Sequence, residues 1–234
     1  MESTRASGRI LRSATHRLAA AAAAVALTAT VASLAAPASA AGPAAGDELT
    51  YGTDILLQNQ FTGDGGYLDT IGSLTQPSGA TFDVATNQKP NSRGAKTSVW
   101  KVVSATGKVD GTPVNSGDVV YLVNQFGGGT YLDANGGSSK AGAKYDVSST
   151  LSKDRAAGSG KWQIFGKASS YGDGHIRTAD VVSLLNTYNY DGSSGGFLDA
   201  NGASSQPGAK LDVSTSHYTD RGPGTGSWKV LPAA

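Results

Sequence analysis

The chain has 234 residues, a formal net charge of +1, 32 glycines and no cysteine. The absence of cysteine excludes disulfide bonds, thiol catalysis and cysteine-ligated metals. The nearly balanced charge gives no basic field that would attract nucleic acid or an anionic membrane. Abundant glycine with regularly spaced aromatic residues favours short strands joined by tight turns.

Residues 1–40 have the pattern of a secretory signal peptide. Four arginines lie within residues 1–17, an alanine-rich apolar run covers residues 18–36, and an Ala-Ser-Ala site ends at residue 40. Its removal leaves 15 basic and 17 acidic residues, a net charge of −2. The sequence therefore predicts a secreted, extracellular protein with no membrane contact after cleavage and no nucleic-acid partner. Residues 41–51 are predicted to form a linker.

Residues 52–234 contain three copies of one unit, over residues 52–116, 117–178 and 179–234. Each copy has four strand-like blocks in the same order: an aliphatic run ending in Asn, an aromatic-Leu-Asp segment, an apolar-Asp-Val segment and a Trp-x-apolar segment. One such unit cannot bury its apolar face alone, so the copies are expected to close on one another. We predict an all-β fold, a β-trefoil of three four-stranded repeats with pseudo-three-fold symmetry. A β-prism is the alternative.

The middle of each copy resembles the ricin-type β-trefoil lectin repeat. The resemblance is carried by residues 131–139 and 197–202, by the Gly-Ala-Lys segments at 142–144 and 208–210, and by the tryptophan of each copy. This chain departs from the family pattern in having an aromatic residue in place of Cys and no Gln-x-Trp. The resemblance implies that the aspartate of each Leu-Asp pair accepts hydrogen bonds from sugar hydroxyls.

The predicted carbohydrate-binding residues come from the same segment of each copy. They are Asp69, Asp133, Asn135, Asp199, Asn201, Tyr67, Tyr131 and Phe197. Turn formation explains the same Asp and Asn residues, and core burial explains the same aromatic residues, so both interpretations stay open. Copy one has Ile71 where the other copies have Asn, which predicts two or three equivalent sites. The tryptophans recur at one point beside apolar residues, so we predict that they lie in the core.

A second set of acidic residues recurs in the third block of each copy. It is predicted to form one ion pair per copy with a recurring arginine. The aspartates are Asp83, Asp146 and Asp212, and the arginines are Arg93, Arg155 and Arg221.

Catalysis has little support in the sequence. The only glutamate after residue 40 is Glu48, and His175 and His217 occupy unlike positions in their copies. No His-Glu-x-x-His and no P-loop spacing occurs, and no cluster of metal-ligand residues is evident, so we predict no enzyme activity, no cofactor and no metal. The favoured function is a secreted, non-catalytic, lectin-like protein that binds a glycan or polysaccharide. The alternative is a secreted protease inhibitor that uses a loop such as Asn87–Thr97 or His217–Gly226. The oligomeric state is not predictable from the sequence.

Overall fold

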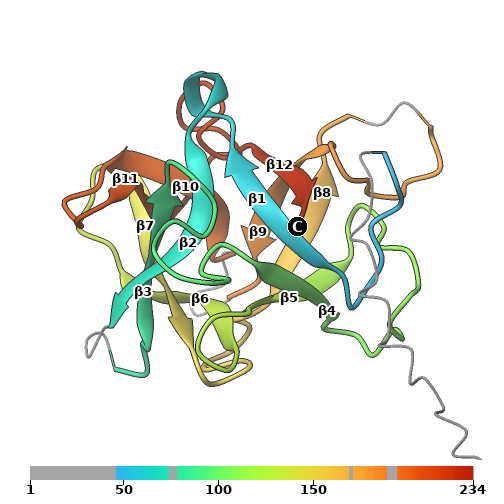
Figure 1. The fold of residues 1–234 in the computed structure, drawn as a ribbon, viewed down its shortest axis with the longest axis horizontal. Coiled ribbons are helices and arrows are strands. Elements are labelled where there is room, and N and C mark those ends of the chain that lie inside the picture. Colours follow the sequence, from blue (N-terminus) through green and yellow to red (C-terminus); the bar gives the residue numbers. More distant parts are fainter. Residues whose placement is uncertain (1–45, 74–77, 169–170, 189–193, 234) are drawn as a thin grey trace, which may run out of the picture. The chain divides into compact units, whose positions relative to one another are not determined.

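The computed structural model describes residues 46–73, 78–168, 171–188 and 194–233. These residues form an all-β structure with one short 3-10 turn, η1 (Phe61–Gly63) (Figure 1). The strands are β1 (Asp54–Asn59), β2 (Gly66–Ser73), β3 (Phe82–Asn87), β4 (Trp100–Ser104), β5 (Val119–Asn124), β6 (Thr130–Gly137), β7 (Ala143–Thr150), β8 (Trp162–Gly166), β9 (Val181–Asn186), β10 (Gly196–Ala203), β11 (Ala209–Ser216) and β12 (Trp228–Pro232). No helix in the described ranges is long and apolar enough to cross a membrane.

Every strand-like block of the sequence is a strand in the structure. The first strands of the three copies, β1, β5 and β9, share one order of buried and half-buried positions, and so do the second strands, β2, β6 and β10. Apolar residues that alternate with polar ones place one face of each strand inward. The predicted positions of the strands are therefore confirmed.

The strands of all copies join in one antiparallel sheet. The fourth strand of each copy pairs with the first strand of the next: β4 with β5, β8 with β9, and β12 with β1. The third strands also pair across copies, β3 with β7, β7 with β11, and β11 with β3. An isolated copy would leave these edges without hydrogen-bond partners, and pairing between copies removes that cost.

The fold class predicted from the sequence needs a correction. The sheet closes into an antiparallel barrel of ten strands with two further strands added to it. The predicted β-trefoil of three four-stranded repeats is therefore wrong. The β-prism alternative is wrong as well, because it needs a separate four-stranded sheet for each copy. All-β architecture is the part of the prediction that holds.

The tryptophans occupy the core, as predicted. All three are 0% exposed, and each indole N–H donates a hydrogen bond of 2.9 Å to the carbonyl of the leucine in the second strand of its own copy. A buried indole needs such a partner for its N–H. The pairs are Trp100 with Leu68, Trp162 with Leu132, and Trp228 with Leu198.

The segment before β1 belongs to the folded body. Leu49 is 0% exposed, and its N–H donates to the carbonyl of Ile176 at 2.8 Å. The Tyr51 side chain is also buried, and its hydroxyl donates to Asp118 at 2.7 Å. Leu49 and Tyr51 therefore contribute to the core, and both lie in the segment 41–51 for which the sequence predicts a linker. The predicted signal peptide, residues 1–40, lies outside the described residues.

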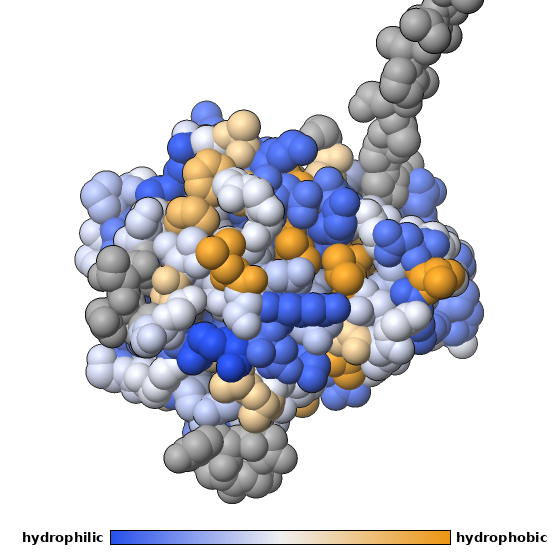
Figure 2. Space-filling view, turned by 90° about the horizontal axis from the view of Figure 1, so that it is seen from below, coloured by the Kyte–Doolittle hydropathy of each residue, from blue (hydrophilic) through white to orange (hydrophobic). Residues whose placement is uncertain are grey.

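The surface is mainly polar on the face shown in Figure 2, where hydrophobic side chains form small patches separated by polar ones. In the described part of the chain, the exposed large hydrophobic residues are Val109, Leu151, Tyr171 and Tyr218. Isolated residues of this kind are normal on a soluble surface.

Candidate functional site

The three aspartates predicted to contact sugar are completely buried. In copy two, Asp133 accepts a hydrogen bond from the Ser159 hydroxyl at 2.7 Å and one from Arg155 Nε at 3.1 Å. Burial raises the pKa of Asp69, Asp133 and Asp199, and the neighbouring hydroxyl groups and arginines act in the opposite direction. These carboxylates lie beneath the surface and hold protein groups in place. They do not present an oxygen to a ligand in solution.

The recurring arginines pair with these buried aspartates. The predicted pairing with the aspartates of the third strands is therefore wrong. Contacts between segments distant in sequence decide the partner, and no spacing in the sequence reports them. The ion pairs are Arg93 with Asp69 at 3.7 Å, Arg155 with Asp133 at 3.1 Å, and Arg221 with Asp199 at 3.2 Å.

The third-strand aspartates instead gather where β3, β7 and β11 pair with one another. Lys140 lies 3.7 Å from Asp146 and 3.5 Å from Asp212. Burial raises the pKa of Asp83, while Lys140 lowers it and the other two aspartates raise it further. One lysine thus offsets repulsion among acidic groups from all three copies.

Each copy contains a pocket at an equivalent place. Its wall is made by the end of the second strand, by the first residues of the third strand and by the recurring arginine. An aromatic residue that follows the first strand of another copy completes it. The pocket volumes are about 210 Å³ in copy one, 400 Å³ in copy two and 320 Å³ in copy three. The arginines are Arg93, Arg155 and Arg221, and the aromatic residues from the other copy are Phe126, Tyr188 and Phe61 respectively.

A buried asparagine positions each of these aromatic residues through a hydrogen bond to its backbone N–H. In copy three, Asn186 Oδ1 accepts a hydrogen bond of 3.0 Å from the N–H of Tyr188, two residues on, which forms an Asx turn. The amide of Asn186 donates to the carbonyl of Ser159 at 2.7 Å, which ties this turn to copy two. Asn59 and Asn124 make the same contacts at the other two junctions. The turn chemistry of one copy thus completes the pocket of another.

The pocket of copy two carries the most polar groups. Tyr145 and Tyr188 meet edge to face, with ring centroids 5.3 Å apart and an interplanar angle of 85°. Arg155 and Asn135 line the same pocket, and the Asn135 amide donates to the Ser148 hydroxyl at 2.9 Å. Two phenol rings, an amide and a guanidinium group therefore converge on one cavity.

Other residues of the predicted site have different positions. Asn201 is 9% exposed and accepts a hydrogen bond of 2.7 Å from Arg221. The half-buried aromatic residues Tyr67, Tyr131 and Phe197 do not line the three pockets. Of the predicted set, Asn135 lines one of these three pockets.

Sequence reasoning missed the residues that build the pocket of copy two. Tyr145 and Tyr188 are its aromatic residues, and Arg155 was assigned to a different partner. The sequence did contain a signal for Tyr188. In every copy an aromatic residue stands two positions after the Asn that ends the first strand, at 61, 126 and 188. Only the structure shows that these side chains reach another copy.

Two other places in the described residues bring polar side chains together. Glu48, Asp173 and His175 bring one ligand atom each within 4.8 Å of one another. Arg177 already donates to both carboxylates of this cluster, at 3.2 Å to Glu48 and 2.6 Å to Asp173, so a guanidinium occupies the cationic position. The loops suggested for protease inhibition, 87–97 and 217–226, each turn an arginine toward a buried aspartate. The inhibitor function stays a prediction.

Comparison with known proteins shows structures of similar fold but identifies no protein family for this chain. No protein-family model and no curated protein matches the chain. A Caenorhabditis elegans protein of unknown function superimposes with a TM-score of 0.60 and 17% identity, covering 79% of this chain and 96% of that one. The SDF2-like protein from Arabidopsis thaliana superimposes with a TM-score of 0.58 and 16% identity. The match covers 79% of this chain and 95% of that one.

A third solved structure is the S. cerevisiae protein O-mannosyltransferase Pmt1-Pmt2 complex bound to the sugar donor. It gives a TM-score of 0.57 and 14% identity, and the match covers 80% of this chain but 26% of that one. Identities this low show a shared fold alone. The resemblance to ricin-type lectin repeats is therefore corrected: the structural neighbours are an SDF2-like protein and a protein of unknown function. The descriptions lectin and β-trefoil are not supported.

Proposed function

We propose that this chain is a non-catalytic glycan-binding protein whose principal site is the pocket of copy two. The observation that supports the proposal is the convergence of Tyr145, Tyr188, Asn135 and Arg155 on one cavity of about 400 Å³. Small-molecule sites usually have volumes of about 300–1,000 Å³ and combine aromatic walls with a few polar groups. The pocket has this composition and this size.

The chemistry of the pocket matches that of a sugar ring. One face of a pyranose presents C–H groups that pack on an aromatic ring, while its edge presents hydroxyl groups. Arg155 and the phenol groups of Tyr145 and Tyr188 supply polar groups to the cavity. Asn135 is 1% exposed and its amide donates to Ser148, so it shapes the pocket wall from behind. Asp133 lies behind Arg155 and fixes the guanidinium. In this proposal the recurring aspartate positions a binding residue and makes no contact with the sugar.

The absence of an acidic residue from the pocket wall supports a binding role rather than hydrolysis. Glycoside hydrolases commonly need two carboxyl groups on either side of the bond that is cleaved. Among the described residues that line this pocket, none is acidic, and Asp133 is 0% exposed and paired with Arg155. The signal-like residues 1–40 support an extracellular place of action.

A glycan array probed with residues 41–234, followed by titration of the best glycan, tests the proposal. Replacing Tyr188 by Ala removes one ring from the pocket, and we expect affinity to fall about tenfold, which corresponds to ~1.4 kcal/mol. Tyr218→Ala is the matched control, because Tyr218 is 68% exposed and lies outside the pocket. Failure of the wild-type chain to bind any glycan, or equal affinity of the Tyr188→Ala variant, contradicts the proposal.

A further inference from the structure

The pocket of copy one has the same construction as that of copy two but different chemistry. At three equivalent positions an apolar side chain replaces a polar one. The amide and both phenol hydroxyls of copy two are thereby absent. The replacements are Ile71 for Asn135, Phe82 for Tyr145, and Phe126 for Tyr188.

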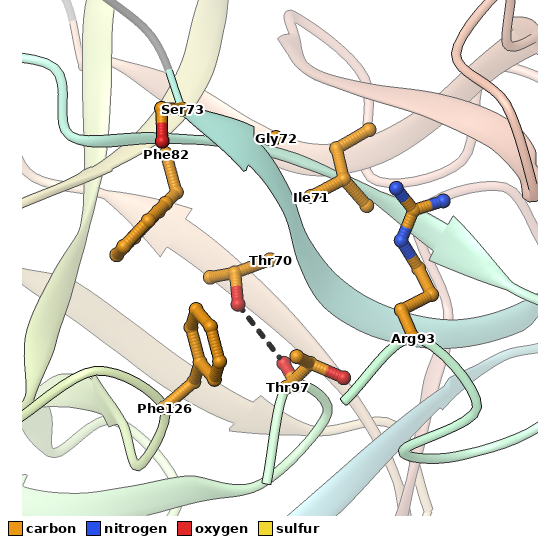
Figure 3. A pocket seen from close by; sticks show the side chains of 8 residues that line it. All are labelled: Thr70, Ile71, Gly72, Ser73, Phe82, Arg93, Thr97 and Phe126. Carbon is orange, nitrogen blue, oxygen red and sulfur yellow. Dashed lines mark hydrogen bonds between the residues drawn. The ribbon is translucent and has the colours of Figure 1, made fainter. Parts of the chain in front are cut away.

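The two phenylalanine rings form a fixed apolar wall. Phe82 and Phe126 meet edge to face, with centroids 5.4 Å apart and an interplanar angle of 62°. Figure 3 shows both rings on one side of the pocket, with Ile71 and Arg93 on the other. Gly127 lies against the Phe82 ring, because a Cβ built at this glycine would meet two of its ring atoms at 3.5 Å. The wall is therefore built before any ligand arrives.

Arg93 gives this pocket, which Thr70, Ser73 and Thr97 also line, one cationic group. Its Nε lies 3.7 Å from Asp69 Oδ1, whereas the arginines of copies two and three lie 3.1 and 3.2 Å from their aspartates. Asp69 Oδ1 is buried and has no hydrogen-bond partner. The ion pair is thus looser in copy one, and the guanidinium is less fully neutralised by its own carboxylate than in the other copies.

We infer that the pocket of copy one binds a small aromatic carboxylate, with the ring against Phe82 and Phe126 and the carboxylate on Arg93. An apolar wall favours an aromatic ring over a hydroxyl-rich sugar, and a guanidinium group pairs well with a carboxylate. The volume of about 210 Å³ lies below the usual range for drug-sized ligands. The ligand is therefore a single-ring acid of the size of benzoate.

This inference is independent of the glycan proposal, because it concerns another copy and another ligand class. Fluorine NMR titration of residues 41–234 with 4-fluorobenzoate tests it, and 4-fluorobenzyl alcohol serves as the uncharged counterpart. We expect the carboxylate to bind at least fivefold more tightly than the alcohol. In a separate NMR spectrum of the protein's backbone amides, the chemical-shift changes caused by 4-fluorobenzoate are expected to centre on Gly72 and Gly94. These residues lie next to Ile71 and Arg93 in the chain.

Variants locate the site. Phe126→Ala removes part of the wall and is expected to abolish binding, whereas Phe61→Ala, the equivalent change for the pocket of copy three, leaves it unchanged. Arg93→Gln is expected to reduce 4-fluorobenzoate affinity to that of the alcohol. Ile71→Asn introduces the residue of copy two and is expected to weaken binding. The thermal midpoint of each variant shows whether it is folded.

Three results overturn the inference: equal affinity for the acid and the alcohol, amide shifts confined to other regions, or full binding by a folded Phe126→Ala protein. Tyr188→Ala separates the two proposals, because it is expected to lose glycan and retain 4-fluorobenzoate. Loss of 4-fluorobenzoate binding in Tyr188→Ala also overturns the assignment to copy one. If no variant of copy one folds, the amide shifts of the wild-type chain decide alone.

Discussion

Asp69, Asp133 and Asp199 show how burial changes the role of a repeated residue. Each follows a buried leucine in the second strand, and each is 0% exposed. A hydroxyl donor from the loop before the fourth strand binds the carboxylate in copies one and two, Ser98 and Ser159. A charge taken out of water is tolerated only with such partners. The residue that looked like a ligand contact is therefore part of the framework.

The buried carboxylate of copy one gives a pH-dependent prediction. Burial raises the pKa of Asp69 above its ordinary value near 3.9. At pH values between the unfolded and the folded pKa, the folded protein holds a proton that the unfolded chain has released, so stability falls as the pH rises through the folded pKa. Asp69→Asn removes this titration and keeps an acceptor for Ser98. We expect the variant to gain stability relative to wild type as the pH rises from 4 to 7.

Urea denaturation of both proteins at several pH values measures this difference. Leu151→Ala, which shortens an exposed side chain that does not titrate, is a control whose offset from wild type is expected to stay constant with pH. A difference between Asp69→Asn and wild type that does not vary with pH contradicts the prediction. So does a trend of opposite sign.

At the scale of elements, the arginines join the hairpins of different copies. Arg221 binds Asp199 in its own copy and donates from Nη1 to the carbonyl of Ala141 in the β6–β7 turn at 3.2 Å. Gly142 allows this approach, because its φ is +73° and an added Cβ would lie 2.7 Å from Arg221 Cδ. Positive φ is the conformation in which glycine is favoured. A turn glycine of one copy therefore accommodates the arginine of another.

Removal of this arginine is expected to destabilise the fold. Arg221→Met leaves the buried Asp199 without its cation and breaks the contact to Ala141. Breaking a fully buried pair costs about 3–5 kcal/mol, and partial exposure of the arginine lowers the expected loss to about 2 kcal/mol. Denaturation of the variant and of wild type in guanidinium chloride measures this loss in the free energy of unfolding.

A double variant and a surface control make this test specific. Adding Asp199→Asn to Arg221→Met removes the unpaired charge, so we expect it to recover part of the lost stability. Met in place of the exposed Lys89 is expected to change the free energy of unfolding by less than about 0.5 kcal/mol. Equal stability of Arg221→Met and wild type would show that the contact between copies contributes nothing.

At the scale of the whole molecule, the segment before β1 joins the loops that follow β4 and β8. Three isolated bridges join segments outside the strands: Glu48 with Arg177, Thr50 with Pro113, and Asn115 with His175. Leu49 and Tyr51 are part of the hydrophobic core. The N-terminal segment thus connects to parts of copies one and two that are far away in sequence.

Truncation tests the importance of this segment. A chain that begins at residue 52 lacks Leu49 and Tyr51, and loss of one buried leucine side chain alone costs about 2–5 kcal/mol. We expect the thermal midpoint to fall by at least about 10 °C relative to a chain that begins at residue 46. Differential scanning calorimetry measures both. Equal midpoints would restore the linker interpretation of residues 46–51.

Local pattern predicted much of this protein. Alternation of apolar and polar residues gave the strand positions, and the regular recurrence of tryptophan gave its burial. The closure of the barrel was predicted wrongly, because strand order depends on which edges pair across copies, and period-two patterning is the same for every order. The burial of Leu49 could not be predicted, because a short segment without periodicity carries no local sign of burial.

The sequence by itself determined the three copies, the four strands of each copy and the buried tryptophans, because these follow from residue type and spacing along the chain. The tertiary structure alone decided that Arg155 pairs with Asp133 and not with Asp146, and that Tyr188 completes the pocket of copy two. Both depend on residues brought together from different parts of the chain. Their contact energies exist only once the copies have packed, so no local pattern of residues reports them.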